Sequence, residues 1–314
     1  MPPQITIIGL GLIGASAGLA LKAQEKEFVI VGHDRENEAV TRARKLGAID
    51  KSHWNLISAC EQADFILLAL PTAAILPTLT ALRGALKPGC VLLDAAPIKG
   101  PLLAAAADAL SENTYFVGGN PLLARSGLTA ADASADLFKE ASWALCPTPA
   151  TAADAIRVAT DFVSLLGAQP LFLDPAEHDG LMAAVQGLPS VLAAALTHTL
   201  GQAAAWRELR RMAGVQFEQT SYLPDHSAAD LAAGILPSAP FVSGWIDLLI
   251  AELQEWQRLL AGQDEQAVQA RFAAALETRQ AWLHTRARGE WEATPGPPLE
   301  KPSVLGRLFG LSRR

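Results

Sequence analysis

The chain has 314 residues, of which 50% are hydrophobic and 18% charged, enough for two domains with substantial cores. A formal net charge of −7 leaves no basic excess, so we do not expect nucleic acid as a partner. Cys60, Cys90 and Cys146 lack the spacing of metal ligands. The first strand begins almost at the first residue, which leaves no room for a signal peptide. No apolar run of membrane-spanning length is free of polar residues or proline. We therefore expect a cytoplasmic protein with reduced cysteines, no metal site and no membrane span.

The first predicted elements form a nucleotide-binding pattern. A β-branched strand at 5–8 leads into Gly9-x-Gly11-x-x-Gly14, and an Ala/Leu-rich helix follows at once. Gly9 allows a tight turn, Gly11 lets the backbone approach a pyrophosphate, and Gly14 lets the helix pack on the strand. The free N–H groups and positive dipole end of the helix favour phosphate. The pattern predicts a dinucleotide site.

A second strand, 28–31, leads to Asp34, which lies 20 residues beyond Gly14. The Asp34 carboxylate can accept hydrogen bonds from ribose hydroxyls and would repel a 2′-phosphate, which favours NAD. The neighbouring Arg35 leaves NADP open, because its guanidinium can pair with that phosphate or stack on the adenine. The predicted cofactor-binding residues are Gly9, Gly11, Leu12, Ile13, Gly14, Asp34, Arg35, Leu70, Pro71 and Thr72.

Strands and helices then alternate as far as residue 173, which predicts a doubly wound, Rossmann-type α/β sheet. The expected strands are 63–70, 91–94, 115–117, 142–146 and 169–173, and the expected helices are 37–46, 73–86, 102–110 and 153–166.

The pattern changes at Asp174-Pro175, a strong helix start. The stretch 181–200 is apolar nearly all round, kinked at Gly187 and Pro189, and predicts a helix buried on every side or at a subunit interface. We expect a homodimer, with a monomeric helical cap as the alternative. The predicted domains are a dinucleotide-binding domain at 1–174, an all-helical dimerisation domain at 175–287 and a Pro-rich tail at 288–314.

Several short motifs occur in a fixed order along the chain. They are Gly9-Leu10-Gly11-Leu12-Ile13-Gly14, Asp94-x-x-x-x-Lys99, Phe116-Val117-Gly118-Gly119-x-Pro121, Glu177-His178-Asp179-x-x-Met182-Ala183, Leu188-Pro189 and Trp245. With these motifs, the chain resembles the prephenate/arogenate dehydrogenase family over about residues 4–285. The resemblance implies an NAD(P)-dependent enzyme of tyrosine biosynthesis that oxidatively decarboxylates a cyclohexadienol carboxylate, using a histidine base and a cation for the side-chain carboxylate.

The substrate positions depart from the family pattern. Asn120 stands where the family has its base histidine, and a neutral amide cannot take a proton at neutral pH. Pro97 replaces an expected serine, and 186–190 lacks both histidines of the family's Ser-His-Leu-Pro-His run, with Ser190 in the last position. Tyr222 aligns with the expected substrate-binding arginine.

Two interpretations follow. Either the enzyme oxidises a different small carboxylate, or it binds NAD as a catalytically weak or inactive sensor or assembly protein. We expect Arg125 to grip a carboxylate, and Lys99, Tyr222 and His198 to offer proton-transfer groups. The alternatives are surface solvation or a phosphate contact for Arg125 and Lys99, packing for Tyr222 and a buried, hydrogen-bonded site for His198. The pattern at His178 favours a structural role. The candidate catalytic residues are Asn120, Ser190, Lys99, Arg125 and Tyr222.

Overall fold

The computed structural model describes residues 2–24, 28–123, 128–223 and 227–289. The described residues form two compact units. In the described ranges, the first includes 2–182 and 222–238, and the second includes 183–221 and 239–289. The predicted domain boundaries at 174 and 287 stay predictions.

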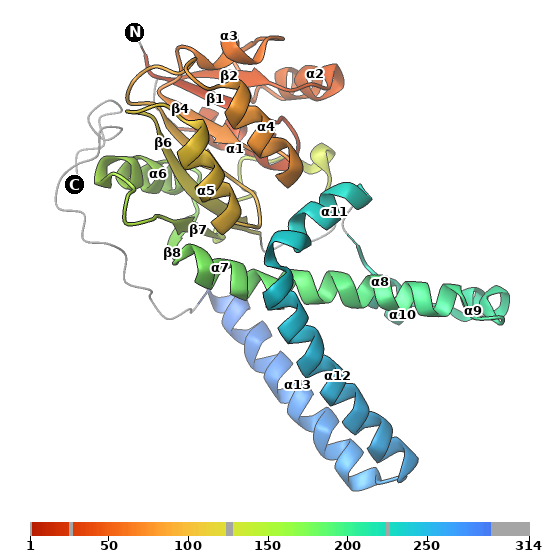
Figure 1. Ribbon diagram of the computed structural model, residues 1–314. Coiled ribbons are helices and arrows are strands. Elements are labelled where there is room, and N and C mark those ends of the chain that lie inside the picture. The colour runs from red at the N-terminus through yellow and green to blue at the C-terminus, as the bar shows by residue number, and fades with distance from the viewer. Residues whose placement is uncertain (1, 25–27, 124–127, 224–226, 290–314) are drawn as a thin grey trace. The chain divides into compact units, whose positions relative to one another are not determined.

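The first unit is built on one eight-stranded sheet with the order β3-β2-β1-β4-β5-β6-β7-β8 (Figure 1). Neighbouring strands are parallel except β6 and β7, which are antiparallel. The order in which successive strands are added reverses between β1 and β4, and this fold class binds ligands at such a point. The strands are β1 (Gln4–Ile8), β2 (Val29–His33), β3 (Lys51–Ser52), β4 (Phe65–Leu68), β5 (Val91–Asp94), β6 (Tyr115–Leu122), β7 (Ser142–Cys146) and β8 (Gln169–Phe172).

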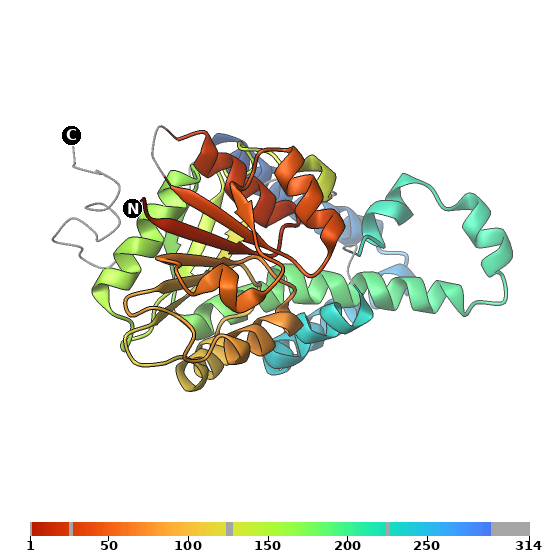
Figure 2. The same ribbon diagram turned by 90° about the horizontal axis from the view of Figure 1, so that it is seen from above.

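Helices cover both faces of this sheet (Figure 2). Successive residues of β4 alternate between two cores: Phe65 and Leu67 face one, and Ile66 and Leu68 face the other. The strands are apolar on both sides because neither face meets water. The first core includes residues of α1 (Leu12–Lys22), α2 (Asn37–Lys45) and α6 (Ala153–Leu165), and the second includes residues of α3 (Leu56–Cys60), α4 (Thr72–Ala81) and α5 (Gly100–Ala109).

The predicted fold class, a doubly wound sheet followed by helices, is confirmed. One departure is β6, which continues past the predicted 115–117 through Pro121 to Leu122. Its second half pairs only with β7, because β5 ends at Asp94. The first unit also contains α7 (Pro175–Met182), α11 (Ala228–Ile235) and the 3₁₀ turns η1 (Ala130–Asp132) and η3 (Leu236–Ser238).

All the regular secondary structure described in the second unit is helical. A π-helical turn, η2 (Ala183–Gly187), precedes α8 (Leu188–Gly201), so the kink expected at Gly187 and Pro189 takes the form of a wider turn. The remaining helices are α9 (Trp206–Met212), α10 (Val215–Thr220), α12 (Ala239–Ala261) and α13 (Glu265–Arg288).

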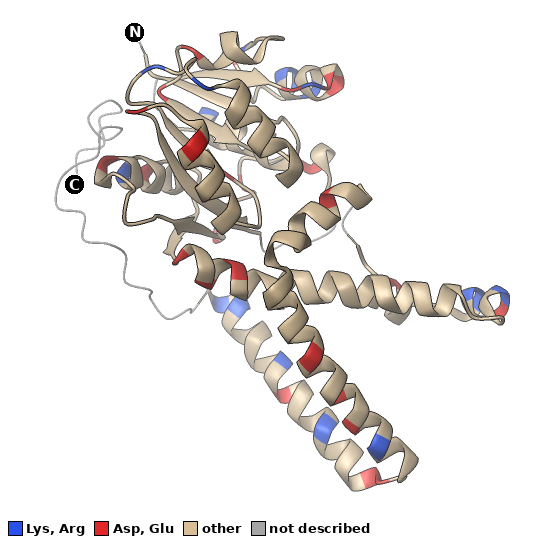
Figure 3. Cartoon of the chain, viewed as in Figure 1, with Lys and Arg blue, Asp and Glu red and all other residues tan. Residues whose placement is uncertain are grey.

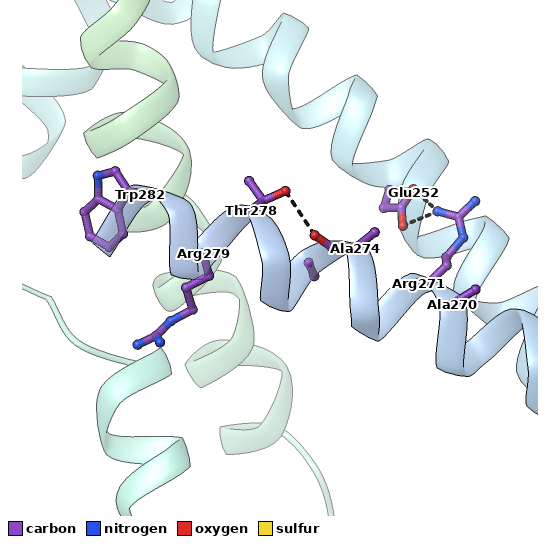
Figure 4. Close-up of a pocket in the computed structure, with 8 residues that line it drawn as sticks. Glu252, Ala270, Arg271, Ala274, Thr278, Arg279 and Trp282 are labelled. Atoms are coloured by element: carbon purple, nitrogen blue, oxygen red, sulfur yellow. Dashed lines mark hydrogen bonds and ion pairs between the residues drawn. The ribbon is translucent and has the colours of Figure 1, made fainter. Parts of the chain in front are cut away.

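Helices α12 and α13 form an antiparallel hairpin. Asp264 caps α13 by accepting a hydrogen bond from the Ala267 N–H at 3.0 Å. Across the hairpin, the rings of Trp256 and Phe272 lie 4.8 Å apart, and Arg271 forms an ion pair with Glu252. An open groove of about 820 Å³ lies along this hairpin and is lined by Glu252, Ala270, Arg271, Ala274, Ala275, Thr278, Arg279 and Trp282 (Figure 4).

Two helical segments are long and apolar enough to cross a membrane by length and composition alone. They are Pro175–Gly201 and Ala228–Ala261, with mean hydropathies of 1.5 and 1.4. Both contain prolines, which is why the sequence shows no uninterrupted apolar run. Only 17% and 11% of their most apolar windows are buried within the single chain. Helix α8 contains no Lys, Arg, Asp or Glu along its length (Figure 3).

Candidate functional site

The glycine turn between β1 and α1 has the geometry of a nucleotide-binding loop. Gly9 has φ +91°, and a Cβ there would lie 2.2 Å from the carbonyl oxygen of Ala69. A Cβ on Gly14 would lie 1.9 Å from the carbonyl oxygen of Gly9. A Cβ on Gly11 would meet nothing within 4 Å, so this position faces open space. The backbone at Gly11 is therefore accessible to a ligand.

Helix α1 begins at this open position. Gly11 is its N-cap, and no side chain caps the first turn, which contains Leu12 and Ile13. The first-turn N–H groups are therefore free to bind a phosphate, and the helix dipole favours negative charge at the same place.

Asp34 lies directly beside the glycine turn. Its Oδ2 accepts a hydrogen bond from the Leu10 N–H at 2.7 Å, and its Oδ1 accepts one from the Glu36 N–H at 2.9 Å. Each carboxylate oxygen keeps a lone pair for a ribose hydroxyl. Arg35 points away from the fold, with 83% of its side chain exposed, and forms an ion pair with Glu36 at 3.3 Å.

The turn after β4 forms the other wall of this region. A Cβ on Gly9 would lie 3.2 Å from Leu70 Cδ2, so Leu70 touches the glycine turn. Pro71 is exposed and precedes α4, of which Thr72 is the first residue. The structure thus gathers the predicted cofactor-binding residues at the carboxyl ends of β1, β2 and β4.

A second group of polar residues lies past the end of β5. Asp94, the last residue of β5, accepts a hydrogen bond from the Gly119 N–H at 2.8 Å. The Lys99 ammonium binds Asp94 Oδ2 and the Gly119 carbonyl oxygen, the latter at 2.7 Å. Both charged side chains are 0% exposed. The surface alternative for Lys99 is therefore wrong, and its ammonium holds the strand that carries Asn120.

Asn120 contacts the start of α7. Its Nδ2 lies 3.1 Å from His178 Nε2, and His178 Nδ1 lies 2.9 Å from Asp179 Oδ1. Asp179 also accepts hydrogen bonds from the Lys99 and Gly100 N–H groups, at 2.7 and 2.8 Å, and so caps α5. Asn120, His178 and Asp179 are 5%, 1% and 5% exposed. We call these three residues the buried triad.

The other candidates do not join the buried triad within what the structure describes. The Ser190 hydroxyl donates to the Gln186 carbonyl oxygen of its own helical segment at 2.9 Å. Tyr222 is 52% exposed. His198 is exposed on α8, so in the single chain it does not occupy the buried site given as its alternative. Arg125 lies outside the described residues.

The cysteines are buried and unpaired. Burial raises the pKa of the Cys60, Cys90 and Cys146 thiols to about 12, with nearby charges as smaller contributions at the last two. Among the described residues no three His, Cys, Asp or Glu side chains gather in a way that would hold a metal ion.

Sequence reasoning found Asn120 and His178 but not the contact between them. The sequence does contain one signal for this site, the adjacent pair His178-Asp179 in the first turns of α7. A histidine beside a carboxylate often has one ring nitrogen fixed by a hydrogen bond. The distance between Asn120 and His178 along the chain gave no indication that they touch.

Family comparisons cover most of the chain. A model of the nucleotide-binding domain of prephenate dehydrogenase matches residues 17–171, and a model of its dimerization domain matches residues 174–276. The chain is 29% identical over 283 residues to the prephenate dehydrogenase of Lactococcus lactis subsp. cremoris, covering 88% of this chain and 77% of the relative. It is 27% identical to the cyclohexadienyl dehydrogenase of Zymomonas mobilis, covering 88% and 94%.

The fold is also shared with solved structures. The crystal structure of prephenate dehydrogenase from A. aeolicus in complex with hydroxyphenyl propionate and NAD+ superposes with a TM-score of 0.80. The superposition covers 90% of this chain and 99% of that one at 20% sequence identity. At this identity the likeness concerns the fold alone.

Proposed function

This chain belongs to the prephenate dehydrogenase family, and from that premise we propose that it binds NAD+ and oxidises a small hydroxylated carboxylate of the prephenate or arogenate class. The observation that carries the proposal is the glycine turn, open only at Gly11 and held to Asp34 through the Leu10 N–H. The nicotinamide, when bound, accepts a hydride from the substrate carbon.

Different residues of the cofactor site would bind different parts of NAD+. The first-turn N–H groups of α1, at Leu12 and Ile13, would hold the pyrophosphate, and Asp34 would accept the ribose hydroxyls. A carboxylate at this place disfavours a 2′-phosphate, which supports NAD+ over NADP+. The exposed Arg35 keeps NADP+ as an outcome of the test.

The substrate half lacks an obvious base. Loss of a hydride from an alcohol carbon requires that the hydroxyl proton also leave, and Asn120 cannot take it at neutral pH. We propose that Asn120 binds the substrate hydroxyl, and that Ser190, Arg125 and Tyr222 contact other parts of the substrate. Lys99, 0% exposed and paired with Asp94, would position the Gly119-Asn120 backbone rather than transfer a proton.

A second candidate is an NAD-binding protein with little or no turnover. The replacement of the base by Asn120 and of the expected serine by Pro97 favours it. Both candidates share the cofactor site, so they differ only in whether a substrate is oxidised.

The test is NADH formation at 340 nm by the purified protein, with prephenate and arogenate offered separately and NAD+ compared with NADP+. Turnover within about a hundredfold of an ordinary enzyme's ~10 s⁻¹ supports the dehydrogenase. NAD+ binding without turnover of either compound supports the second candidate. Failure to bind either nucleotide contradicts both.

Two neighbouring variants check that any binding uses the proposed site. Asp34→Ala removes a charged hydrogen-bond acceptor and should weaken NAD+ binding by about tenfold or more. Arg35→Ala, one residue away and exposed, should leave NAD+ binding within about twofold, because an exposed charge of this kind contributes little. If Arg35→Ala instead weakens NADP+ binding by more than Asp34→Ala weakens NAD+ binding, the cofactor assignment changes from NAD+ to NADP+.

We propose that the protein is a homodimer assembled through its helical unit. The match to a dimerization domain and the low burial of the apolar helices within one chain support this. An interface of this kind would give the exposed apolar side chains of α8 and α12 a partner.

A further inference from the structure

The buried triad determines the direction of one side-chain amide. Asn120, on β6, contacts His178 Nε2 at 3.1 Å, and Asp179 contacts the opposite ring nitrogen at 2.9 Å. All three residues are nearly enclosed, with exposed fractions between 1% and 5%. Water therefore has little room to compete for these hydrogen bonds.

The partners of Asp179 decide where the His178 proton lies. Each Asp179 oxygen already accepts a backbone N–H, from Lys99 at 2.7 Å and from Gly100 at 2.8 Å, at the start of α5. A carboxylate in this setting is an acceptor, so the His178 nitrogen facing it must carry the hydrogen. In the neutral ring, Nε2 is then an acceptor and must receive its hydrogen bond from the NH₂ group of Asn120.

The amide of Asn120 thus has a fixed orientation. Because its NH₂ group faces His178, its carbonyl oxygen Oδ1 points the other way. Among the described residues nothing donates a hydrogen bond to Oδ1. Since Oδ1 is absent from the fully enclosed side-chain atoms that lack a partner, this atom is not fully enclosed. One hydrogen-bond acceptor is therefore left over beside the position where the resemblance places a base.

We propose that His178, itself held by Asp179, is a positioning residue that fixes the Asn120 amide so that Oδ1 accepts the hydrogen bond of the substrate hydroxyl. This rests on the proposed function, which supplies a hydroxylated substrate. Inversion of the amide would present NH₂ to the hydroxyl and would place Oδ1 against the Nε2 lone pair. The contact with His178 would then be lost, and the hydroxyl could only receive a hydrogen bond from Asn120 instead of donating one.

Two ligands that differ only in a hydroxyl group measure this contact. We would titrate NAD+-loaded protein with 3-(4-hydroxyphenyl)propionate and with 3-phenylpropionate, and take the ratio of the two dissociation constants. The wild-type protein should prefer the hydroxylated ligand by about tenfold, the value of a typical hydrogen bond.

Two variants of His178 separate its two contacts. In His178→Gln, the side-chain carbonyl can take the place of Nε2 and still accept from Asn120, so the hydroxyl preference should be largely kept. In His178→Asn, the shorter amide can still donate to Asp179 but cannot reach Asn120, so the preference should fall to about twofold or less. Equal preferences in the two variants would overturn the positioning role.

A substrate-free measurement decides the orientation independently. Long-range ¹H–¹⁵N spectra of the wild-type protein report which ring nitrogen of each histidine is protonated, and His178→Gln assigns the His178 signals among the six histidines. A proton on Nδ1 alone supports the inference, and a proton on Nε2, with or without one on Nδ1, overturns it. If neither ligand binds, the proposed function fails, while these spectra still decide the orientation of Asn120.

Discussion

Replacing Gly14 by alanine would place a Cβ 1.9 Å from the Gly9 carbonyl oxygen, and only a shift of the α1 backbone can relieve that contact. Gly14→Ala should lower the free energy of unfolding in urea by about 1–3 kcal/mol, as overpacking typically does. At Gly11 the added methyl meets no atom within 4 Å, so Gly11→Ala should leave stability within about 0.5 kcal/mol of the wild type. It should nevertheless weaken NAD+ binding, because the methyl occupies the approach of the pyrophosphate. Equal losses of stability in Gly14→Ala and Gly11→Ala would contradict this difference between a packed glycine and one that faces the ligand.

The ion pair of Lys99 with Asp94 offers a second comparison between single residues. Lys99→Met should destabilise the protein by about 3–5 kcal/mol, because Asp94 would remain charged and 0% exposed without its cation. Lys22 pairs with Asp50 at a site where the two side chains are 38% and 31% exposed, so Lys22→Met should cost only about 0–1 kcal/mol. Urea unfolding of both variants measures the difference. A small loss at Lys99 would mean that the buried pair contributes little, and would reopen a catalytic role for its ammonium.

At the scale of elements, α5 depends on a carboxylate supplied by another helix. Asp179, on α7, accepts from the two backbone N–H groups that open α5, and Lys99, the N-cap residue, provides no side-chain cap. Asp179→Ala should therefore lower the free energy of unfolding by about 1–3 kcal/mol, since two N–H groups would be left without an acceptor. Asp264→Ala, at the exposed cap of α13, is the matched control and should cost about 1 kcal/mol. A larger loss at Asp264 would argue against the proposed cap.

Sequence periodicity predicted the long elements well because their patterns are local. The strand at 91–94 and the helix start at Asp174-Pro175 lie where the pattern placed them. The two-residue strand β3 and the short helix α3 were missed, since neither is long enough to show a period.

The candidate site was harder to predict because its decisive features are not local. A proline is unusual in the interior of a strand, but β6 continues through Pro121, where it pairs with β7. Lysine is rarely enclosed, so nothing in the sequence indicated that Lys99 is 0% exposed. The cofactor site could be predicted from the sequence because its main motif lies within one turn. The Asn120–His178 contact could not, because it joins residues 58 positions apart.

At the scale of the whole molecule, the three buried thiols report on the integrity of the first unit. Burial raises the pKa of Cys60, Cys90 and Cys146 to about 12, so a thiol reagent at pH 8 should label none in the native protein and three after unfolding. Labelling of a native thiol within minutes would show that its core opens readily.

The same shifts predict how stability changes at high pH. The folded pKa lies above the unfolded value of about 8.5, so the stabilising contribution of each thiol is fully present below that pH. It is lost as the pH rises toward 12, because the unfolded chain ionises first. For Cys60 the loss should reach about 2 kcal/mol at pH 10. Urea unfolding at pH 7 and pH 10 should show a smaller pH-dependent decrease for Cys60→Ala than for the wild type, and equal decreases would contradict the assignment.

The helical unit has more apolar surface than a monomer ordinarily exposes. Val185, Leu248, Phe272 and Leu276 are 69%, 63%, 57% and 55% exposed in the single chain. Apolar surface on this scale needs a partner, and the match to a dimerization domain makes a second copy the expected one. Sedimentation equilibrium should therefore give a mass of twice 33.1 kDa.

The groove of the α12–α13 hairpin is where we expect the partner to contact this surface. Ala274 lines the groove on α13, between Arg271 and Thr278 (Figure 4). Ala274→Arg would place a charged side chain in the interface while leaving the exposed helix intact, so it should shift the protein toward the monomer. Gln280→Arg makes a similar change on α13 outside the groove and should remain dimeric. A monomeric wild type would contradict the assembly, whereas a dimeric Ala274→Arg variant would move the interface away from the groove and onto another face of the unit, such as the uncharged α8.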